Sequence, residues 1–227
     1  MVKTYNYLVI IPARSGSQRL PGKNMRNLGD KPLLQHSIDY ALDNDLNDII
    51  VTSNDRTVLD YALKNKVQIV RRPNKLAGNT EPVITALQHA LSQLQKKYDA
   101  IVLLQPTNPL RPKNLIKQAI SIFENKNCDS LMTVTRNEHK LGTISNNKFI
   151  PFNYTMGQRS QDLEPLYYEN GLLYIFKTEL LSQDKILGEK NYPLIVDHPF
   201  AEIDIDTEAD FVKAKMYYQN FNDESIN

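Results

Sequence analysis

The sequence predicts an α/β fold, with a mostly parallel sheet covered by helices on both faces. Two observations predict it. Up to about residue 136, short apolar runs alternate with longer amphipathic runs. The short runs are apolar almost without interruption, which is typical of parallel strands that are buried on both faces of a sheet.

The expected elements follow one another in that rhythm. The sequence predicts strands at 7–12, 48–53, 67–70, 99–105 and 130–135, and helices at 33–44, 56–65, 81–97 and 112–125. In the first helix, Leu34, Ile38 and Leu42 fall on one face. Asp55 is expected to cap the second helix, and Pro112 lies near the first turn of the fourth.

From about residue 137 the alternation stops. Residues 137–170 are polar, aromatic and rich in turn-forming residues, so we expect them to leave the sheet as an excursion. The chain then returns with expected strands at 172–176 and 201–206 and a closing helix at 207–221. Residues 222–227 are expected to fray. We expect a single domain over residues 1–227, which is an ordinary size for one α/β domain.

The composition shows no large excess of positive or negative charge, so any site that binds an anion must be local. Among 227 residues, 27 are basic and 26 are acidic, so neither nucleic acid nor a membrane is expected as a partner. The single cysteine, Cys128, excludes an intramolecular disulfide and is expected to be buried. The start of the chain shows no signal-peptide pattern. No run approaches the ~20 apolar residues of a membrane span, so we expect a cytoplasmic protein.

The loop after the first strand is a candidate phosphate site. It reads IIPARSGSQRLPGKN over residues 10–24 and carries the cations Arg14, Arg19 and Lys23. Its glycines let backbone N–H groups approach an anion, and ligands of open α/β sheets bind beyond the carboxyl ends of the strands. The alternative is a solvated basic loop with glycines at its turns.

Spacing excludes two common phosphate loops. Five residues separate Gly16 from Gly22, where a Walker A loop has four, and Lys23 is followed by Asn24 in place of a hydroxyl residue. A dinucleotide-binding loop needs the spacing G-x-G-x-x-G at the start of a helix, which Pro21 and the glycine spacing forbid.

A candidate metal site lies near the carboxyl end of the chain. In AEIDIDTEAD, Asp204 and Asp206 alternate with isoleucines, so a strand there would direct both carboxylates to the same side. Two carboxylates at the end of a strand suit Mg²⁺. The alternative is that Asp206 or Thr207 caps the following helix, with Asp210 completing a capping box.

Together these blocks resemble a known family, the acylneuraminate cytidylyltransferases. IIPARSGSQRLPGKN followed by LGDKPLLQHSIDYAL is similar to the family's opening, and RRPNKLAGNT, LLQPTNPLR, RSQDLEPLYYENGLLYIF and EIDIDTEADF follow in the family's order, over roughly residues 6 to 212. The resemblance implies a Rossmann-like nucleotidyltransferase fold. It implies transfer of CMP from CTP to a nine-carbon 2-keto acid sugar, a nonulosonic acid, with release of pyrophosphate. It also implies Mg²⁺ or Mn²⁺ as cofactor, and a homodimer in which residues 137–170 reach over the partner's active site.

The resemblance also implies roles for individual residues. The implied catalytic residues are Arg14, Lys23 and Asp206. The implied nucleotide contacts are Ala13, Arg14, Ser15, Gly16, Lys23, Asn24, Arg72 and Thr80. The implied sugar contacts are Gln105, Arg159, Gln161 and Asn170, and the implied metal ligands are Asp204 and Asp206. On the residues alone, Arg72 could equally be an exposed strand end, and the excursion could be a solvated hairpin.

The chain departs from the family's pattern in its nucleotide-binding blocks. Gln18 stands where a lysine is frequent, which removes one charge from the phosphate loop. Asn79 stands where an aspartate is usual, which puts any role of that carboxylate in doubt. The segment QRL replaces the frequent Lys-Gly-Ile and favours a relative of the sialic acid enzymes over a true one.

Two other functions stay open at this point. One is CMP activation of an eight-carbon keto sugar, although NGLLYIF and DIDTEADF fit that family poorly. The other is a nucleotide-binding module without catalysis, which the joint presence of Arg14, Lys23, Asp204 and Asp206 disfavours. The motifs do not show whether the acceptor is N-acetylneuraminic, legionaminic or pseudaminic acid, because a site distinguishes the substituents of these sugars through a few hydrogen bonds.

Overall fold

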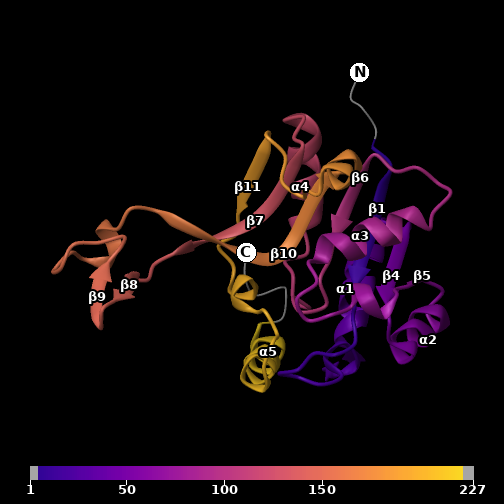
Figure 1. The fold of residues 1–227 in the computed structure, drawn as a ribbon, viewed down its shortest axis with the longest axis horizontal. Coiled ribbons are helices and arrows are strands. Elements are labelled where there is room, and N and C mark those ends of the chain that lie inside the picture. Colours follow the sequence, from indigo (N-terminus) through magenta and orange to yellow (C-terminus); the bar gives the residue numbers. More distant parts are fainter. Residues whose placement is uncertain (1–4, 222–227) are drawn as a thin grey trace.

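The computed structural model describes residues 5–221 and contains the predicted α/β sheet (Figure 1). Within that range the main sheet has seven strands in the order β11-β7-β10-β6-β1-β4-β5. They are β1 (Tyr7–Pro12), β4 (Ile49–Ser53), β5 (Gln68–Arg71), β6 (Ala100–Leu103), β7 (Ser130–Asn137), β10 (Leu166–Lys177) and β11 (Asn191–Ile195). β1 pairs in parallel with β4 and β6, and β4 pairs in parallel with β5, as predicted.

Helices cover both faces of this sheet. They are α1 (Leu33–Leu42), α2 (Arg56–Lys64), α3 (Val83–Ser92) and α4 (Leu115–Asn125). A further helix, α5 (Glu208–Asn220), lies beside the sheet. The predicted apolar face of α1 is wrong in one residue. Leu34 and Ile38 are buried, but Leu42 is 43% exposed, because Ala41 and not Leu42 turns toward the sheet.

Alternate residues of the parallel strands enter two hydrophobic clusters. In β1, Val9 and Ile11 pack with residues of α1, α2 and α4, whereas Leu8 and Ile10 pack with residues of α3 on the other face. All four side chains are fully buried. Cys128 is buried in the first of these clusters as a free thiol, as predicted.

Individual residues determine where several of the helices begin and end. The Asp55 carboxylate accepts a hydrogen bond from the backbone N–H of Thr57 (2.8 Å), so the predicted cap of α2 is confirmed. α4 begins at Leu115, later than predicted, and the carbonyl of Pro112 accepts the N–H of Leu115 ahead of the helix. α3 ends at Ser92, short of the predicted end at 97, because the polar run 95–97 has no apolar face to pack.

The later part of the sheet corrects the sequence prediction in three places. β10 lies antiparallel between β6 and β7, because the chain returns from β7 without a crossover helix. β11, which the sequence did not predict, pairs in parallel with β7. The predicted strand at 201–206 is wrong: Pro199–Glu202 form a 3₁₀ helix, and residues 203–206 continue as an unpaired extended segment.

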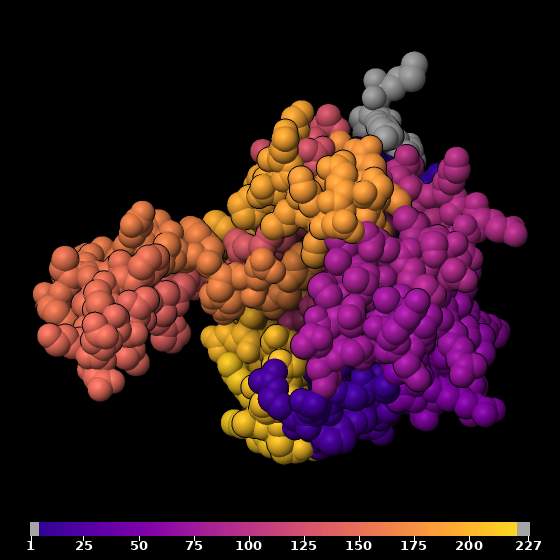
Figure 2. Space-filling model, viewed as in Figure 1, coloured from indigo at the N-terminus to yellow at the C-terminus, as the bar shows by residue number. Residues whose placement is uncertain are grey.

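Residues 138–165 project from the body as an arm (Figures 1 and 2). Within the arm, β8 (Gly142–Ser145) and β9 (Lys148–Pro151) pair as an antiparallel hairpin. Asn146 and Asn147 form its turn with φ of 50° and 59°, a conformation that asparagine tolerates. No helix in the described range is long and apolar enough to cross a membrane. The predicted fraying of residues 222–227 lies outside the described residues.

A third cluster joins the segment after β1 to the start of α5 beside the sheet. Leu20 and Leu28 of the N-terminal region pack with Ile203, Ile205 and Phe211 at the start of α5. A small antiparallel pair, β2 (Asn27–Leu28) and β3 (Lys31–Pro32), continues this wall. The packing places the opening loop next to the acidic segment 203–206.

Candidate active site

A cavity of about 220 Å³ opens beyond the carboxyl ends of β1 and β6. Open α/β sheets bind their ligands in this position. Six of the residues that the sequence singled out line this sheet-end cavity: Arg14, Lys23, Asn24, Arg72, Gln105 and Asp206. The fold therefore brings together side chains from four separate segments of the chain.

The opening loop is braced by its own polar groups. Gly22 adopts a left-handed conformation (φ 66°) just before a short 3₁₀ helix, Lys23–Met25. The Asn24 amide donates to the carbonyl of Arg14 (3.0 Å). Ser15 is held from outside the loop, because its backbone N–H donates to Oδ1 of Asn54 (2.8 Å). These contacts fix the backbone that presents the loop's cations.

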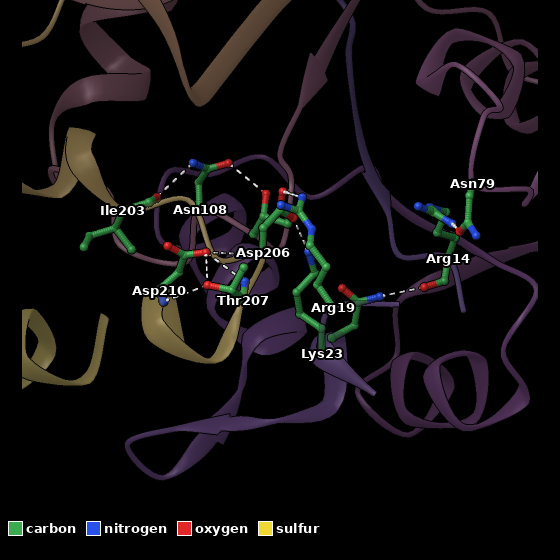
Figure 3. Close-up of polar contacts among 11 residues, drawn as sticks. Arg14, Arg19, Lys23, Asn79, Asn108, Ile203, Asp206, Thr207 and Asp210 are labelled. Carbon is green, nitrogen blue, oxygen red and sulfur yellow. Dashed lines mark hydrogen bonds and ion pairs between the residues drawn. The ribbon is translucent and has the colours of Figure 1, made fainter. Parts of the chain in front are cut away.

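Two cations of the loop converge on Asp206 (Figure 3). Nζ of Lys23 lies 2.8 Å from Oδ1 of Asp206, and an Nη atom of Arg19 lies 2.5 Å from Oδ2. Lys23 is only 8% exposed, so the carboxylate stabilises an ammonium group that has lost most of its water. The Arg19 side chain is exposed.

Arg72 is a buried guanidinium without an acidic partner among the described residues. It is 5% exposed, and one Nη atom donates to the carbonyl of Thr52 (2.9 Å), while Nε has no hydrogen-bond partner there. Desolvation, with a smaller contribution from the charge of Arg14, lowers the pKa of Arg72 to about 10. The group is still cationic at neutral pH, so a bound anion would stabilise it.

Asn79 contacts the same group of cations. Its Oδ1 accepts a hydrogen bond from an Nη atom of Arg14 (2.7 Å) (Figure 3). A neutral amide orients Arg14 as a carboxylate would, but it does not neutralise the guanidinium. Compared with the aspartate that the resemblance implies at this position, the amide therefore leaves more positive charge for a ligand.

We expect Asn79→Asp to weaken CTP binding. The new carboxylate would pair with Arg14 and compete with phosphate, which we expect to cost on the order of 1 kcal/mol, or about fivefold in Kd. Isothermal titration with CTP at low salt measures this. Asn65→Asp, which adds the same charge at the C-terminus of α2, is the matched control. Equal affinity in wild type and Asn79→Asp would contradict the role given to Asn79.

Neither Asp204 nor Asp206 of the acidic segment caps α5, the helix that follows. Thr207 is the N-cap of α5, and its side chain and Asp210 form a capping box. The alternative role for Asp206 as a cap is therefore not used. Ile203 and Ile205 are buried, as the alternating pattern predicts, although the segment is not a strand.

The two carboxylates nevertheless meet different surroundings. Asp206 lines the sheet-end cavity, and Asp204 lines a larger cavity of about 900 Å³ at the base of the arm. Asp204 is open to that arm-side cavity, but the walls of the cavity partly desolvate its carboxyl group. This desolvation, with a smaller contribution from the charge of Asp206, raises the pKa of Asp204. A cation at this position would favour the ionised form.

The donor set fits Mg²⁺ in chemistry. Mg²⁺ is usually held by one or two carboxylates together with phosphate and water oxygens. Asp206 lies beside the cations suited to phosphate, and Asp204 is close enough to Asp206 for their charges to interact. Within residues 5–221 no three carboxylate, histidine or cysteine side chains gather as a metal site, so other ligands would have to come from substrate and water.

The remaining nucleotide candidates from the sequence lie around the sheet-end cavity without lining it. Ala13 is fully buried in the core, where its N–H donates to the carbonyl of Thr52 (3.0 Å). Ser15 and Gly16 line a small adjoining cavity of about 30 Å³. Thr80 is exposed in the turn after Asn79.

The sugar candidates are divided between two places. Gln105 lines the sheet-end cavity and Asn170 lines the arm-side cavity. Arg159 and Gln161 lie on the exposed arm, where Arg159 pairs with Asp162 (2.8 Å), and they line neither cavity. Within one chain the structure does not bring these four residues together.

Sequence reasoning missed three residues that organise this site. Asn54 holds Ser15, and Thr107 and Asn108 contact the acidic segment. Asn54 could have been found from the sequence, because it is a polar residue directly after a buried strand. Thr107 and Asn108 likewise follow the expected strand at 99–105, within a proline-rich turn.

The chain matches the family model described as "Cytidylyltransferase" over residues 8–225. It is 32% identical over 214 residues to an N-acylneuraminate cytidylyltransferase of Streptococcus agalactiae serotype III, covering 90% of this chain and 51% of that protein. It is also 32% identical over 218 residues to a CMP-N,N'-diacetyllegionaminic acid synthase of Legionella pneumophila, covering 90% of this chain and 92% of that protein. The chain thus spans about half the length of its streptococcal relative and nearly all of the Legionella one.

A solved structure shares the fold. A CMP:2-keto-3-deoxy-manno-octonic acid synthetase complexed with CTP superimposes with a TM-score of 0.71 at 16% identity, over 95% of this chain and all of that one. At this identity the likeness shows a common fold.

Proposed function

The chain belongs to the cytidylyltransferase family, and on that premise we propose that it transfers CMP from CTP to a nonulosonic acid, releasing pyrophosphate. The observation that carries the proposal is the sheet-end cavity, in which Arg14, Lys23 and a buried Arg72 without an acidic partner in residues 5–221 surround one space. Two relatives that act on different nonulosonic acids by name support this class of acceptor over an eight-carbon sugar.

The residues of the site would take different roles in the transfer reaction. In the transfer, a sugar hydroxyl oxygen attacks the α-phosphorus of CTP, the bond to the bridging oxygen breaks, and pyrophosphate leaves. Arg14, Lys23 and Arg72 would hold the triphosphate and neutralise the charge that develops on the leaving group. Gln105 and Asn170 would orient the acceptor. Mg²⁺ or Mn²⁺, held by Asp204 and Asp206, would add positive charge at the phosphates when bound.

Pyrophosphate release tests the proposal. The chain is incubated with CTP, Mg²⁺ and a panel of N-acetylneuraminic, legionaminic, pseudaminic and eight-carbon keto acids. We expect release with at least one nonulosonic acid and none with the eight-carbon sugar. Binding of CTP without release for any acceptor would favour a non-catalytic module, and release with the eight-carbon sugar alone would overturn the acceptor class. Because the reaction draws on CTP, we place it in the cytoplasm.

We further propose that the arm makes a homodimer and reaches over the partner's site. Much of its apolar surface has no cover within the described chain: Ile144, Phe149, Ile150, Phe152 and Met156 are each between 49% and 80% exposed. Several large exposed apolar side chains on one segment favour an interface there. Arg159 and Gln161 lie on the same arm, so a partner's arm would supply the sugar contacts that one chain keeps apart.

We expect Ile144→Asp combined with Phe152→Asp to give a folded monomer with weakened use of the sugar. The carboxylates would be costly to bury at an apolar interface. Sedimentation measures the mass, and steady-state kinetics should show a raised KM for the acceptor. Leu63→Asp, at an exposed leucine of α2 (53% exposed), controls for the added charge. A fully active monomeric wild type at micromolar concentration would refute the shared site.

A further inference from the structure

Three separate segments of the site meet at one side chain, Asn108. It is fully buried, and its Nδ2 donates to the carbonyl of Asn170 in β10 (3.0 Å). The same Nδ2 donates to the carbonyl of Ile203 in the acidic segment (2.9 Å) (Figure 3). Its backbone N–H donates to the carbonyl of Gln105 (3.2 Å). Asn108 therefore connects the segments that carry the proposed sugar contacts and the proposed metal ligands.

The acidic segment depends on these contacts for its position. Residues 203–206 belong to no strand, so no ladder of sheet hydrogen bonds holds them. Instead, Asn108 holds the carbonyl of Ile203, and the carbonyl of Thr107 accepts the N–H of Ile205 (2.8 Å). The hydroxyl of Thr107 donates to Oδ1 of Asn108 (3.0 Å), which ties these two residues to each other. Residues 107 and 108 thus hold the backbone of the segment on either side of Asp204.

The β10 side of the contact is equally constrained. The register of β10 against β7 shifts between Glu169 and Tyr174, and Gly171 lies in this bulge with φ of 76°. A Cβ at Gly171 would lie 2.8 Å from Oδ1 of Asn108, so the backbone approaches Asn108 as closely as glycine allows. The Asn170 side chain is fixed in turn by a hydrogen bond from the hydroxyl of Thr133 (2.6 Å).

Only an amide of this size can make the observed contacts. Its single nitrogen carries two N–H groups, and each reaches a different buried carbonyl. Aspartate has the same shape but no donor when ionised, and serine has one donor on a shorter side chain. We propose that Asn108 is a positioning residue that sets the placement of the acidic segment relative to the sugar side of the site. The inference rests on the proposed transfer reaction.

The test compares Asn108→Asp with wild type in three measurements. We expect kcat to fall about 10- to 100-fold, and the half-saturating Mg²⁺ concentration to rise about tenfold, as for other groups that orient metal ligands. Mg²⁺ should also raise the Tm of the CTP-bound protein less than it does in wild type, which requires no turnover. CTP affinity in EDTA should change less than twofold, because Arg14, Lys23 and Arg72 are not moved.

Controls separate positioning from loss of stability. Ser130→Ala removes another buried hydrogen bond, to the N–H of Gly188 (3.0 Å), at the opposite end of the sheet, and should lower Tm without changing the response to Mg²⁺. If Asn108→Asp does not fold, Asn108→Ser carries the same test. A variant with lower Tm but the wild-type response to Mg²⁺ would overturn the inference. Wild type that releases no pyrophosphate would refute the transfer reaction, and the thermal measurement would still decide the positioning role.

Discussion

Replacing Lys23 by alanine should lower kcat/KM by about 30- to 900-fold, which corresponds to a loss on the order of 2–4 kcal/mol of transition-state stabilisation. Lys23 is the most buried cation of the opening loop, and its side chain is 9% exposed. Its Nζ faces Asp206 and lines the sheet-end cavity, where a triphosphate would offer it several oxygens. For a side chain as buried as Lys23, a charge-assisted contact of this kind is stronger than it is at a surface.

Two further variants make the Lys23 result specific. Lys23→Arg should recover only part of the activity, because a planar fork does not fit the space of a compact ammonium group. Lys177→Ala removes a lysine that pairs with Asp129 (2.8 Å) at the other end of the sheet, and should leave turnover unchanged. Steady-state kinetics of pyrophosphate release measures all three. Near-normal turnover in Lys23→Ala would remove Lys23 from the catalytic residues.

Asn substitution at Asp204 or at Asp206 should abolish most activity, by about a thousandfold or more, while the protein stays folded. Each substitution removes a negative charge that we propose for holding a divalent cation, and charge count governs the affinity of such sites. Asp206→Asn also leaves the buried ammonium of Lys23 without its carboxylate, so we expect a larger fall in Tm there than for Asp204→Asn. Asp204 is therefore the cleaner test of the metal.

The capping box supplies the matched control for the metal pair. Thr207→Ala removes the N-cap of α5, which should cost about 1 kcal/mol of stability without touching either carboxylate. We expect it to lower Tm and to leave turnover at saturating Mg²⁺ near that of wild type. Thermal melting and Mg²⁺ titration are measured for all three variants. Two active Asn variants would mean that the carboxylates bind no catalytic metal.

Much of the fold was predictable because it is encoded over short distances. The unbroken apolar runs of β1, β4 and β6 specified strands buried on both faces, and Asp55 marked the start of α2. The prediction failed where an alternating sequence pattern does not lead to pairing of a strand. Residues 201–206 alternate as a strand does, but β10 and β11 already occupy the positions beside β7 in the sheet. The alternation there reflects packing of Ile203 and Ile205 against the cluster beneath α5.

The sequence by itself determined the class of fold, and it pointed to two candidate binding features: the loop at residues 10–24, which is suited to bind an anion, and the carboxylates of Asp204 and Asp206. Each of these depends on residues that are neighbours along the chain. Only the tertiary structure decided which of these groups meet. Lys23 and Asp206 are 183 residues apart, Arg14 and Asn79 are 65 apart, and Asn108 reaches Ile203 across 95. No local pattern encodes such pairs, because they form only when the hydrophobic clusters on both faces of the sheet and beneath α5 bring distant segments together.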